Sequence, residues 1–489
     1  MLWTRISPLF TSGCYDAHLA RAGYAKLHPV ISLEHRLTRF QEKRVNTLSF
    51  HADAIDVILR STPEGNEDLQ EHEFQDDEDS VYWLHLLESM GPDMGSLSLT
   101  QHESQFTFEL PFAAWYFYES VHRLTITCPH LAIPEWIFDV PEIFDGLTSL
   151  VIHSVIETGC LRSLCRCLGQ LERLVCIAPK RPAFATEVPF QRENLPLRME
   201  YMREMTLGLA AQPNTGDFIL ALELPALQHF HMRFRASDTS WAQDIHQTAV
   251  DLAAVIRPLA RHARHAELLA HDQKAVSLVL CRSPTDEPLV VVTLEIEKAR
   301  KRTKTRALEL FPALLSLITL KQVRTLGLAS VYTSPKWREL LSYLNCVEEV
   351  FYMRPKSWKH VVQDSELLEA LWAGQNVPQK GLEAGHTGLV LPSLRTMVFT
   401  GRSIRFSGLR NDTPVAIFDD WAEHPSEQHL FELSRLGDKV GWLDLSRRRV
   451  QFVFEDVEML KNELRVALER GGGREVLMDR SRLIVRSVA

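Results

Sequence analysis

One six-residue pattern recurs along most of the chain and limits what the chain can fold into. In each copy an apolar residue is followed by two variable residues, a second apolar residue, one variable residue and a third apolar residue. Successive copies begin about 24 to 31 residues apart, or about twice that distance. They read VNTLSF from Val45, MGSLSL from Met94, VHRLTI from Val121, LTSLVI from Leu147, LERLVC from Leu171, MREMTL from Met202, LQHFHM from Leu227, AVSLVL from Ala275, VRTLGL from Val323, VEEVFY from Val347, LRTMVF from Leu394 and VGWLDL from Val440.

The alternation and the spacing predict a repeat protein. The last two apolar positions of each copy are two residues apart, so in a β-strand they point to the same face. A single strand cannot bury that face, whereas stacked neighbours form a continuous core. A period of about 24 to 27 residues is typical of leucine-rich repeats. We therefore predict an α/β fold, a right-handed leucine-rich-repeat-like solenoid with parallel strands on the concave face and helices and loops on the convex face. An ordinary doubly wound α/β domain rich in leucine is the alternative.

Apolar residues at helical spacing predict the segments that return the chain from one strand to the next. Two such segments are Leu161–Leu168 and Trp337–Leu344. The pattern breaks around residues 240–300. A long helical stretch is expected there between Trp241 and Leu269, followed by a β-hairpin that turns at Pro284–Asp286. Because a hairpin does not belong in a parallel solenoid, we predict an irregular joint that divides the array near residue 240.

Composition narrows the function classes. The chain has 489 residues and a formal net charge of −9, so binding of nucleic acid through overall positive charge is disfavoured. No apolar run reaches the ~20 residues that span a bilayer, and the start of the chain lacks the apolar region of a secretory signal. The eight cysteines follow no regular framework, which favours reduced thiols. We expect a protein of the cytoplasm, the nucleus or both.

Several stretches resemble a known family. FDGLTSLVIHSVIETGCLRSLCRCLGQLERLVCIAP, from Phe144 to Pro179, resembles a repeat of the fungal F-box proteins with leucine-rich-repeat-like tails. LPALQHFHMRF from Leu224 and LPSLRTMVFTG from Leu391 are similar. LWTRI at Leu2–Ile6 and LARAGYAKLHPVIS at Leu19–Ser32 resemble the segment that follows the F-box helices in that family.

The resemblance implies a function and a domain organisation. It implies the target-recognition part of an F-box subunit of a Skp–cullin–F-box ubiquitin ligase, which binds target proteins on the concave repeat face. A Skp-type adaptor is expected as a partner only where an F-box lies upstream. A repeat scaffold without ligase function is the alternative. The parts expected are a junction segment that would follow an F-box (1–44), a first array with an acidic insertion at 61–80 (45–240), the joint (241–300), and a second array with its cap (301–489).

The variable positions of the repeats predict a binding face. In a repeat array these side chains line the concave sheet, where partners usually bind. Arg123, Arg173 and Arg233 have little acid beside them except Glu204, which favours a partner with an acidic or phosphorylated segment. A generic solvated sheet face is the alternative. The candidate residues are Arg123, Arg173, His229, His231, Arg233, Phe351 and Trp442.

Other clusters of reactive residues have structural interpretations that we favour. Cys160, Cys165, Cys167 and Cys176 lack the paired spacing of a zinc site and are expected to be core or surface thiols. His229 and His231 leave the same face of a strand, as metal ligands do, but no third ligand is evident. The histidines of RHARHAELLAH, which are His262, His265 and His271, are expected on a solvated helix face.

Two charged runs and one glycine run complete the sequence signals. The acidic run Glu64–Ser80 is expected to be a solvated insertion, with recruitment of a basic partner as the alternative. Lys298–Arg306 is expected to be a solvated loop or helix start, with a nuclear-import signal or a docking patch for acidic partners or RNA as alternatives. The glycines at 471–473 follow a helical pattern and are expected to stop a helix. No catalytic spacing is present, so we expect no enzyme and no cofactor.

Overall fold

The structure is a computed structural model of the whole chain. It describes residues 5–7, 10–22, 27–32, 39–49, 52–60, 95–102, 108–109, 121–127, 131–132, 146–153, 165, 169–177, 197–208, 219, 221–235, 245–271, 275–295, 306–329, 334–353, 367–368, 370–371, 390–400, 450–455, 461–470, 474–479 and 482–487. The chain is α/β and divides into two compact units, Met1–Gln228 (unit 1) and His229–Ala489 (unit 2). The sheet in each is mostly parallel and is not closed into a barrel.

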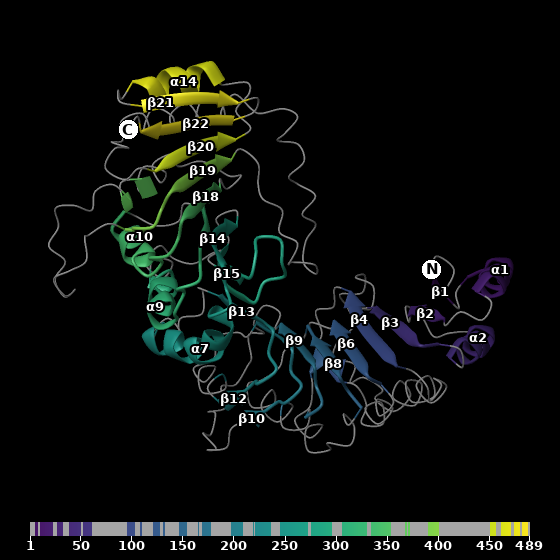
Figure 1. The fold of residues 1–489 in the computed structure, drawn as a ribbon. Helices are drawn as coiled ribbons and strands as arrows, with labels where there is room; N and C mark the ends of the chain where they lie inside the picture. The colour runs from purple at the N-terminus through teal and green to yellow at the C-terminus, as the bar shows by residue number, and fades with distance from the viewer. Residues whose placement is uncertain are drawn as a thin grey trace, which may run out of the picture. The chain divides into compact units, whose positions relative to one another are not determined.

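Unit 1 is built on a run of parallel strands in which each strand pairs with the next along the chain (Figure 1). Every strand pairing described in this unit is parallel. The strands are β1 (Arg5–Ile6), β2 (His28–Ser32), β3 (Ala54–Arg60), β4 (Ser96–His102), β6 (Arg123–Thr127), β8 (Ser149–Ile152), β9 (Arg173–Ile177) and β11 (Glu204–Gly208). Two short parallel pairs lie outside this run. These are β5 (Phe108–Glu109) with β7 (Leu131–Ala132) and β10 (Leu197–Arg198) with β12 (Leu222–Glu223).

The last two apolar positions of the sequence pattern form the core of unit 1, as predicted. The strand register aligns them in two rows, and each of these side chains is at most 2% exposed. One row is Leu97, Leu124, Leu150, Leu174 and Met205, and the other is Leu99, Ile126, Ile152, Cys176 and Leu207. Burial of an aliphatic side chain stabilises a fold by about 1.5–3 kcal/mol. We call this side of the sheet the core face and the opposite side the second face.

Backbone hydrogen bonds repeat just before each strand and fix the register. The carbonyl of His122 accepts the N–H groups of Thr148 and Ser149 at 2.9 and 3.0 Å, and also the Thr148 hydroxyl at 3.1 Å. The carbonyl of Thr148 in turn accepts the N–H groups of Glu172 and Arg173 at 2.8 and 3.1 Å. Because the same pair of bonds recurs from repeat to repeat, neighbouring strands cannot slip by one residue without exposing the core row.

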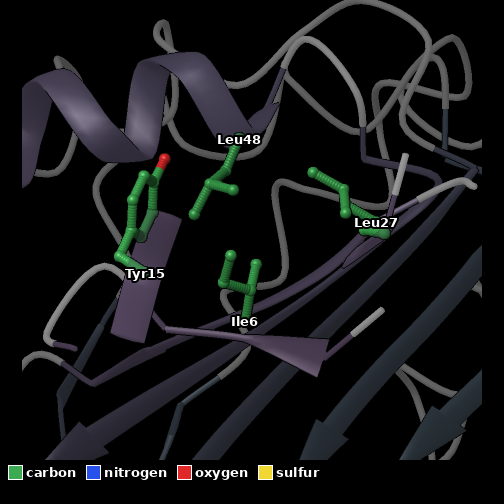
Figure 2. Close-up of a cluster of buried hydrophobic side chains, with 5 residues drawn as sticks. Ile6, Tyr15, Leu27 and Leu48 are labelled. Carbon is green, nitrogen blue, oxygen red and sulfur yellow. The ribbon is translucent and has the colours of Figure 1, made fainter. Parts of the chain in front are cut away.

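Two helices, α1 (Ser12–Ala22) and α2 (Arg39–Ser49), cover the start of the sheet. Figure 2 shows their shared cluster, in which Tyr15 and Leu48 meet Ile6 of β1 and Leu27 beside β2. The Arg44 guanidinium lies 4.3 Å from the centre of the Tyr15 ring and donates to the Phe10 carbonyl at 2.6 Å. The segment expected as a junction, 1–44, thus supplies β1 and β2 to the sheet. Trp3 lies outside the described residues.

The prediction of a strand at VNTLSF is wrong, because Val45–Ser49 belong to helix α2. Val45 and Leu48 are both buried there. The first two apolar positions of the pattern are three residues apart, and that spacing also places two side chains on one face of a helix. The strand of this repeat is β3, in which Ile55 and Val57 take the buried positions.

Unit 2 contains a mixed sheet. In spatial order the strands are β13 (His229–Arg235), β16 (Val290–Glu295), β15 (Ala275–Cys281), β14 (His265–His271), β17 (Thr325–Ala329), β18 (Glu349–Met353), β19 (Thr396–Thr400), β20 (Gln451–Glu455), β22 (Arg482–Ser487) and β21 (Arg474–Asp479). β15 and β22 are antiparallel to both of their neighbours, and the other pairs are parallel. The expected hairpin is confirmed as β15 and β16.

The helices of unit 2 whose bounds the structure describes are α7 (Ile245–Ala260), α9 (Leu310–Leu317), α10 (Ser334–Leu341) and α14 (Lys461–Glu469). Figure 1 shows α7, α9 and α10 following one another on one side of the strands. The helices predicted from Ile245 to Leu259 and from Trp337 onward are confirmed. The helix prediction is wrong beyond Ala260, because His265–His271 forms strand β14.

Several predicted segments lie outside the described residues. These are the VGWLDL copy, the Leu161–Leu168 helix apart from Cys165, the acidic run, the basic run before Arg306, and the glycines at 471–473. On the side of β19 away from β18, the paired strand is β20, in which Phe452 and Phe454 are fully buried and stack with Phe399.

Candidate functional site

The second face of the unit 1 sheet presents two regular rows of hydroxyl, charged and valine side chains. The register places Ser96, Arg123, Ser149, Arg173 and Glu204 in one row across β4, β6, β8, β9 and β11. The adjacent row is Ser98, Thr125, Val151, Val175 and Thr206. Arg123 is exposed and the other residues of both rows are partly exposed. Neighbouring strands in a sheet lie about 4.8 Å apart, so these side chains form a continuous surface.

The two candidate arginines of unit 1 differ in their partners. Arg173 is held by the next strand, since its Nε lies 2.9 Å from Glu204 Oε2. Arg123 has no ion pair within the part of the chain that the structure describes, and its row neighbours are Ser96 and Ser149. Arg123 is therefore the cation of this face that remains available to a ligand.

The three β13 candidates lie in unit 2 and share one side of their strand. His229 Nδ1 lies 2.7 Å from the Pro288 carbonyl, and His231 Nε2 lies 3.3 Å from the Thr293 hydroxyl. Arg233 is ion-paired with Glu295. Burial and the nearby Arg233 charge lower the pKa of His231 from 6.5 to about 4, so His231 is neutral at pH 7.

The remaining two candidates complete the predicted set. Phe351 is half-buried on β18, where the register places it between Gly327 of β17 and Val398 of β19. Trp442 lies outside the described residues. Each group of candidates is defined within its own unit, with Arg123 and Arg173 in unit 1 and the others in unit 2.

A buried polar chain on β14 was not predicted. His265 and Glu267 are 1% and 2% exposed, and His265 Nε2 lies 2.6 Å from Glu267 Oε1. His265 Nδ1 lies 2.7 Å from the Thr325 hydroxyl on β17. In the tautomer of a neutral imidazole that carries its proton on Nε2, Nε2–H donates to Glu267 and Nδ1 accepts from the Thr325 hydroxyl. Glu267 Oε2 is also buried and has no hydrogen-bond partner among the described residues.

The prediction that the histidines of RHARHAELLAH lie on a solvated helix face is wrong. His262 is exposed, but in a turn after α7, and His265 is buried in a central strand rather than lying on a solvated helix face. The sequence signal was present, because ARHAEL from Ala263 repeats the six-residue pattern with alanine at two apolar positions. Ala263, Ala266 and Leu268 are all at most 1% exposed.

Apolar residues flank this polar chain on the same face. Leu269, Val279 and Cys281 form a buried cluster, and the register places Cys281 opposite His265. Burial raises the pKa of the Cys281 thiol to about 12, and the charges of Glu267 and Asp286 act in the same direction. Cys281 is therefore an unreactive thiol at neutral pH.

The members of the predicted cysteine cluster that the structure describes are core residues. Cys165 and Cys176 are buried, and burial raises the pKa of Cys176 to about 12. Cys160 and Cys167 lie outside the described residues. Among the described side chains, no three of His, Cys, Asp or Glu are grouped so as to hold a metal ion.

One groove lies on the helical side of unit 2. It has a volume of about 510 Å³ and is lined by α7, α9 and α10, including Pro312, Ala313 and Tyr343. Lys336 Nζ bridges Glu309 and Glu339 beside it, at 2.5 and 2.9 Å. These hydrogen bonds raise the pKa of Lys336 against the opposing effect of burial. Arg306 also lines the groove. The positive charges of Arg306 and Lys336 balance the negative charges of Glu309 and Glu339, so charge favours no particular class of ligand.

Comparison with known proteins identifies no relative. The chain matches no protein-family model, and no curated protein matches it. In the described part of the chain, no helix has the length and apolar character needed to cross a membrane.

Proposed function

We propose that this chain is a protein-binding repeat module that holds a target protein on the second face of unit 1. The proposal includes a leucine-rich-repeat-like solenoid and the target-recognition role of an F-box subunit in a Skp–cullin–F-box ubiquitin ligase. The sequence resemblance to the fungal F-box family motivates the ligase role. The run of parallel strands in unit 1, with one core face, is compatible with the solenoid.

The observation that carries the proposal is the second face itself. Its two described rows hold hydroxyl, valine and charged side chains that are partly exposed, on strands whose register is fixed by repeated backbone bonds. A rigid surface of this kind costs little conformational entropy on binding. Arg123 lies between Ser96 and Ser149 and offers a guanidinium with hydroxyl groups on both sides. This arrangement fits an acidic or phosphorylated segment of the target, because guanidinium binds carboxylate and phosphate in bidentate geometry.

The experiment is affinity purification of the natural full-length product, tagged at its C-terminus, from its own cells. Arg123→Glu combined with Thr125→Glu reverses the charge of the face, and we expect it to reduce recovery of the target at least tenfold. Arg198→Glu, at an exposed position on β10 that is ion-paired with Glu200, is the matched control and is expected to leave recovery unchanged. Equal recovery with the double variant and the wild type would refute binding at this face.

A repeat scaffold without ligase function is the second candidate. It shares the binding face, so the face variants do not separate the two. Recovery of the Skp-type adaptor and the cullin with the wild-type product supports the ligase role. Recovery of the target without either of them supports the scaffold.

A further inference from the structure

A strip of exposed cations follows the edge of the unit 2 sheet where the parallel strands begin. Arg264, Arg324, Glu348 and Arg395 immediately precede β14, β17, β18 and β19. Each N–H donates to the carbonyl of the preceding member at 2.7–2.8 Å, namely Arg324 to Arg264, Glu348 to Arg324 and Arg395 to Glu348. These bonds place the four residues one strand apart along the edge.

The repeat sequence adds two more cations to this strip. Arg261 and Lys321 occupy equivalent positions, three residues before Arg264 and Arg324. Both are exposed. We define the basic edge as Arg261, Arg264, Lys321, Arg324 and Arg395.

Some of these cations already have structural partners. Arg261 Nε donates to the Pro258 carbonyl at 2.9 Å at the end of α7, where a cation is favourable. Arg324 and Arg395 share Glu348, at 3.6 and 4.0 Å. Neither Arg264 nor Lys321 has an ion pair or side-chain hydrogen bond in the described part of the chain. The edge therefore has five cations to one carboxylate, and two of the cations are unengaged.

The charges next to the two ends of the basic edge show where its excess positive charge is centred. On the β15–β16 hairpin next to Arg264, the exposed Arg282 lies in the same turn as Asp286 and Glu287, so that turn is not basic. At the other end, Arg395 is the last of the cations and is followed along the edge by Gln451, whose N–H donates to the Arg395 carbonyl. The excess positive charge is therefore centred on Arg264, Lys321 and Arg324.

We propose that the basic edge is a docking site for an acidic segment of a partner protein, distinct from the second face of unit 1. Complementary charge on an exposed strip attracts and orients such a segment. A peptide can set a neutral residue opposite Glu348 and acidic residues opposite the flanking arginines. A nucleic acid carries a charge at every nucleotide and would face Glu348 with a phosphate, and the net charge of −9 also opposes a dense polyanion.

The test uses the full chain and three fluorescent probes of equal charge in fluorescence anisotropy. The probes are a Glu/Gly peptide, a phosphoserine/Gly peptide and a single-stranded RNA. We expect the Glu/Gly peptide to bind at least as tightly as either other probe and to weaken with salt. Arg264→Glu combined with Lys321→Glu should weaken it at least tenfold, and both side chains are exposed, so the fold is retained.

Arg198→Glu combined with Arg465→Glu is the matched control, because both are partly exposed or exposed cations in surface ion pairs and the change in net charge is the same. Its affinity should stay within twofold of wild type. The proposal is overturned by undetectable peptide binding at low salt, by equal affinity of the edge variant and the wild type, by an equal loss in the control, or by tighter binding of RNA or of the phosphopeptide.

Discussion

At the scale of single residues, the most consequential feature is the buried chain from Thr325 through His265 to Glu267. Burial of polar groups is unfavourable unless they are hydrogen-bonded, and four of the five side-chain polar atoms of this chain have a partner. The exception is Glu267 Oε2. Gly327 lies opposite Glu267 on β17, so no side chain from that position occupies the space beside the carboxylate.

Removal of the imidazole should destabilise unit 2 more than removal of its hydroxyl partner. His265→Ala leaves both oxygens of a buried carboxylate without a donor, a type of change that costs about 3–5 kcal/mol. Thr325→Val removes one hydrogen bond and should cost about 1 kcal/mol. Urea unfolding followed by circular dichroism measures both. A smaller loss for His265→Ala than for Thr325→Val would show that the chain is not a coupled network.

His231 should make the protein less stable in mild acid. Its pKa is about 4 in the folded protein and 6.5 ordinarily, so the folded state resists protonation and the unfolded state does not. The stabilising contribution is complete above pH 6.5 and is lost as the pH falls from 6.5 towards 4. His231→Gln should flatten this part of the stability profile, measured as the urea midpoint at several pH values. An unchanged slope in the variant would assign the acid sensitivity to other groups.

At the scale of elements, each strand carries a core side chain next to a surface one. In β6, Leu124 is 1% exposed, whereas its neighbour Thr125 points to the second face and is partly exposed. Leu124 aligns with Leu97 on one side and Leu150 on the other, so its removal leaves a cavity between two strands.

Substitutions at these two neighbours should differ sharply in stability. Leu124→Ala should lower the free energy of unfolding of unit 1 by about 2–5 kcal/mol. Thr125→Ala should change it by less than about 1 kcal/mol. Thermal unfolding of both variants measures the difference. Similar losses would mean that β6 is not oriented as described.

The elements also show why some strands were predictable and others were not. Copies with large aliphatic residues, such as VHRLTI and LTSLVI, identified their strands and buried positions correctly. β3 and β14 follow the same pattern, but alanine replaces the larger residue in ADAIDV and ARHAEL, so the signal is weak. VNTLSF was predicted to be a strand but is helical from Val45 to Ser49, because the spacing of Val45 and Leu48 also suits a helix.

The candidate site was less predictable than the fold, because its chemistry depends on partners far apart in the sequence. The sequence placed Arg173 and Arg233 on the surface of their strands and Glu204 near them. It did not reveal that Glu204 pairs with Arg173 or that Glu295 pairs with Arg233. The contact of His265 with Thr325 joins a strand inside the predicted joint to a strand that follows it, and the contact can be inferred only once β14 is known to be a strand.

At the scale of the whole molecule, the two units provide two different surfaces. Unit 1 offers a second face on which Arg123 has no ion pair among the described residues. Unit 2 carries the buried chain of His265 and Glu267 and, at the start of its parallel strands, the basic edge. The proposed protein-binding function rests on the first surface and can be tested without the second.

The most direct measurement is photo-crosslinking from defined positions on unit 1 in the natural full-length product. A benzophenone amino acid at Thr125 reports contacts of the second face, and the same residue at Tyr201, which is 58% exposed outside the strands, is the control. We predict that one protein target is crosslinked from Thr125 and not from Tyr201. We also predict that Arg123→Glu reduces the yield of this crosslinked product at least tenfold. A target crosslinked from Tyr201 alone, or with equal yield from both positions, would contradict binding at the second face.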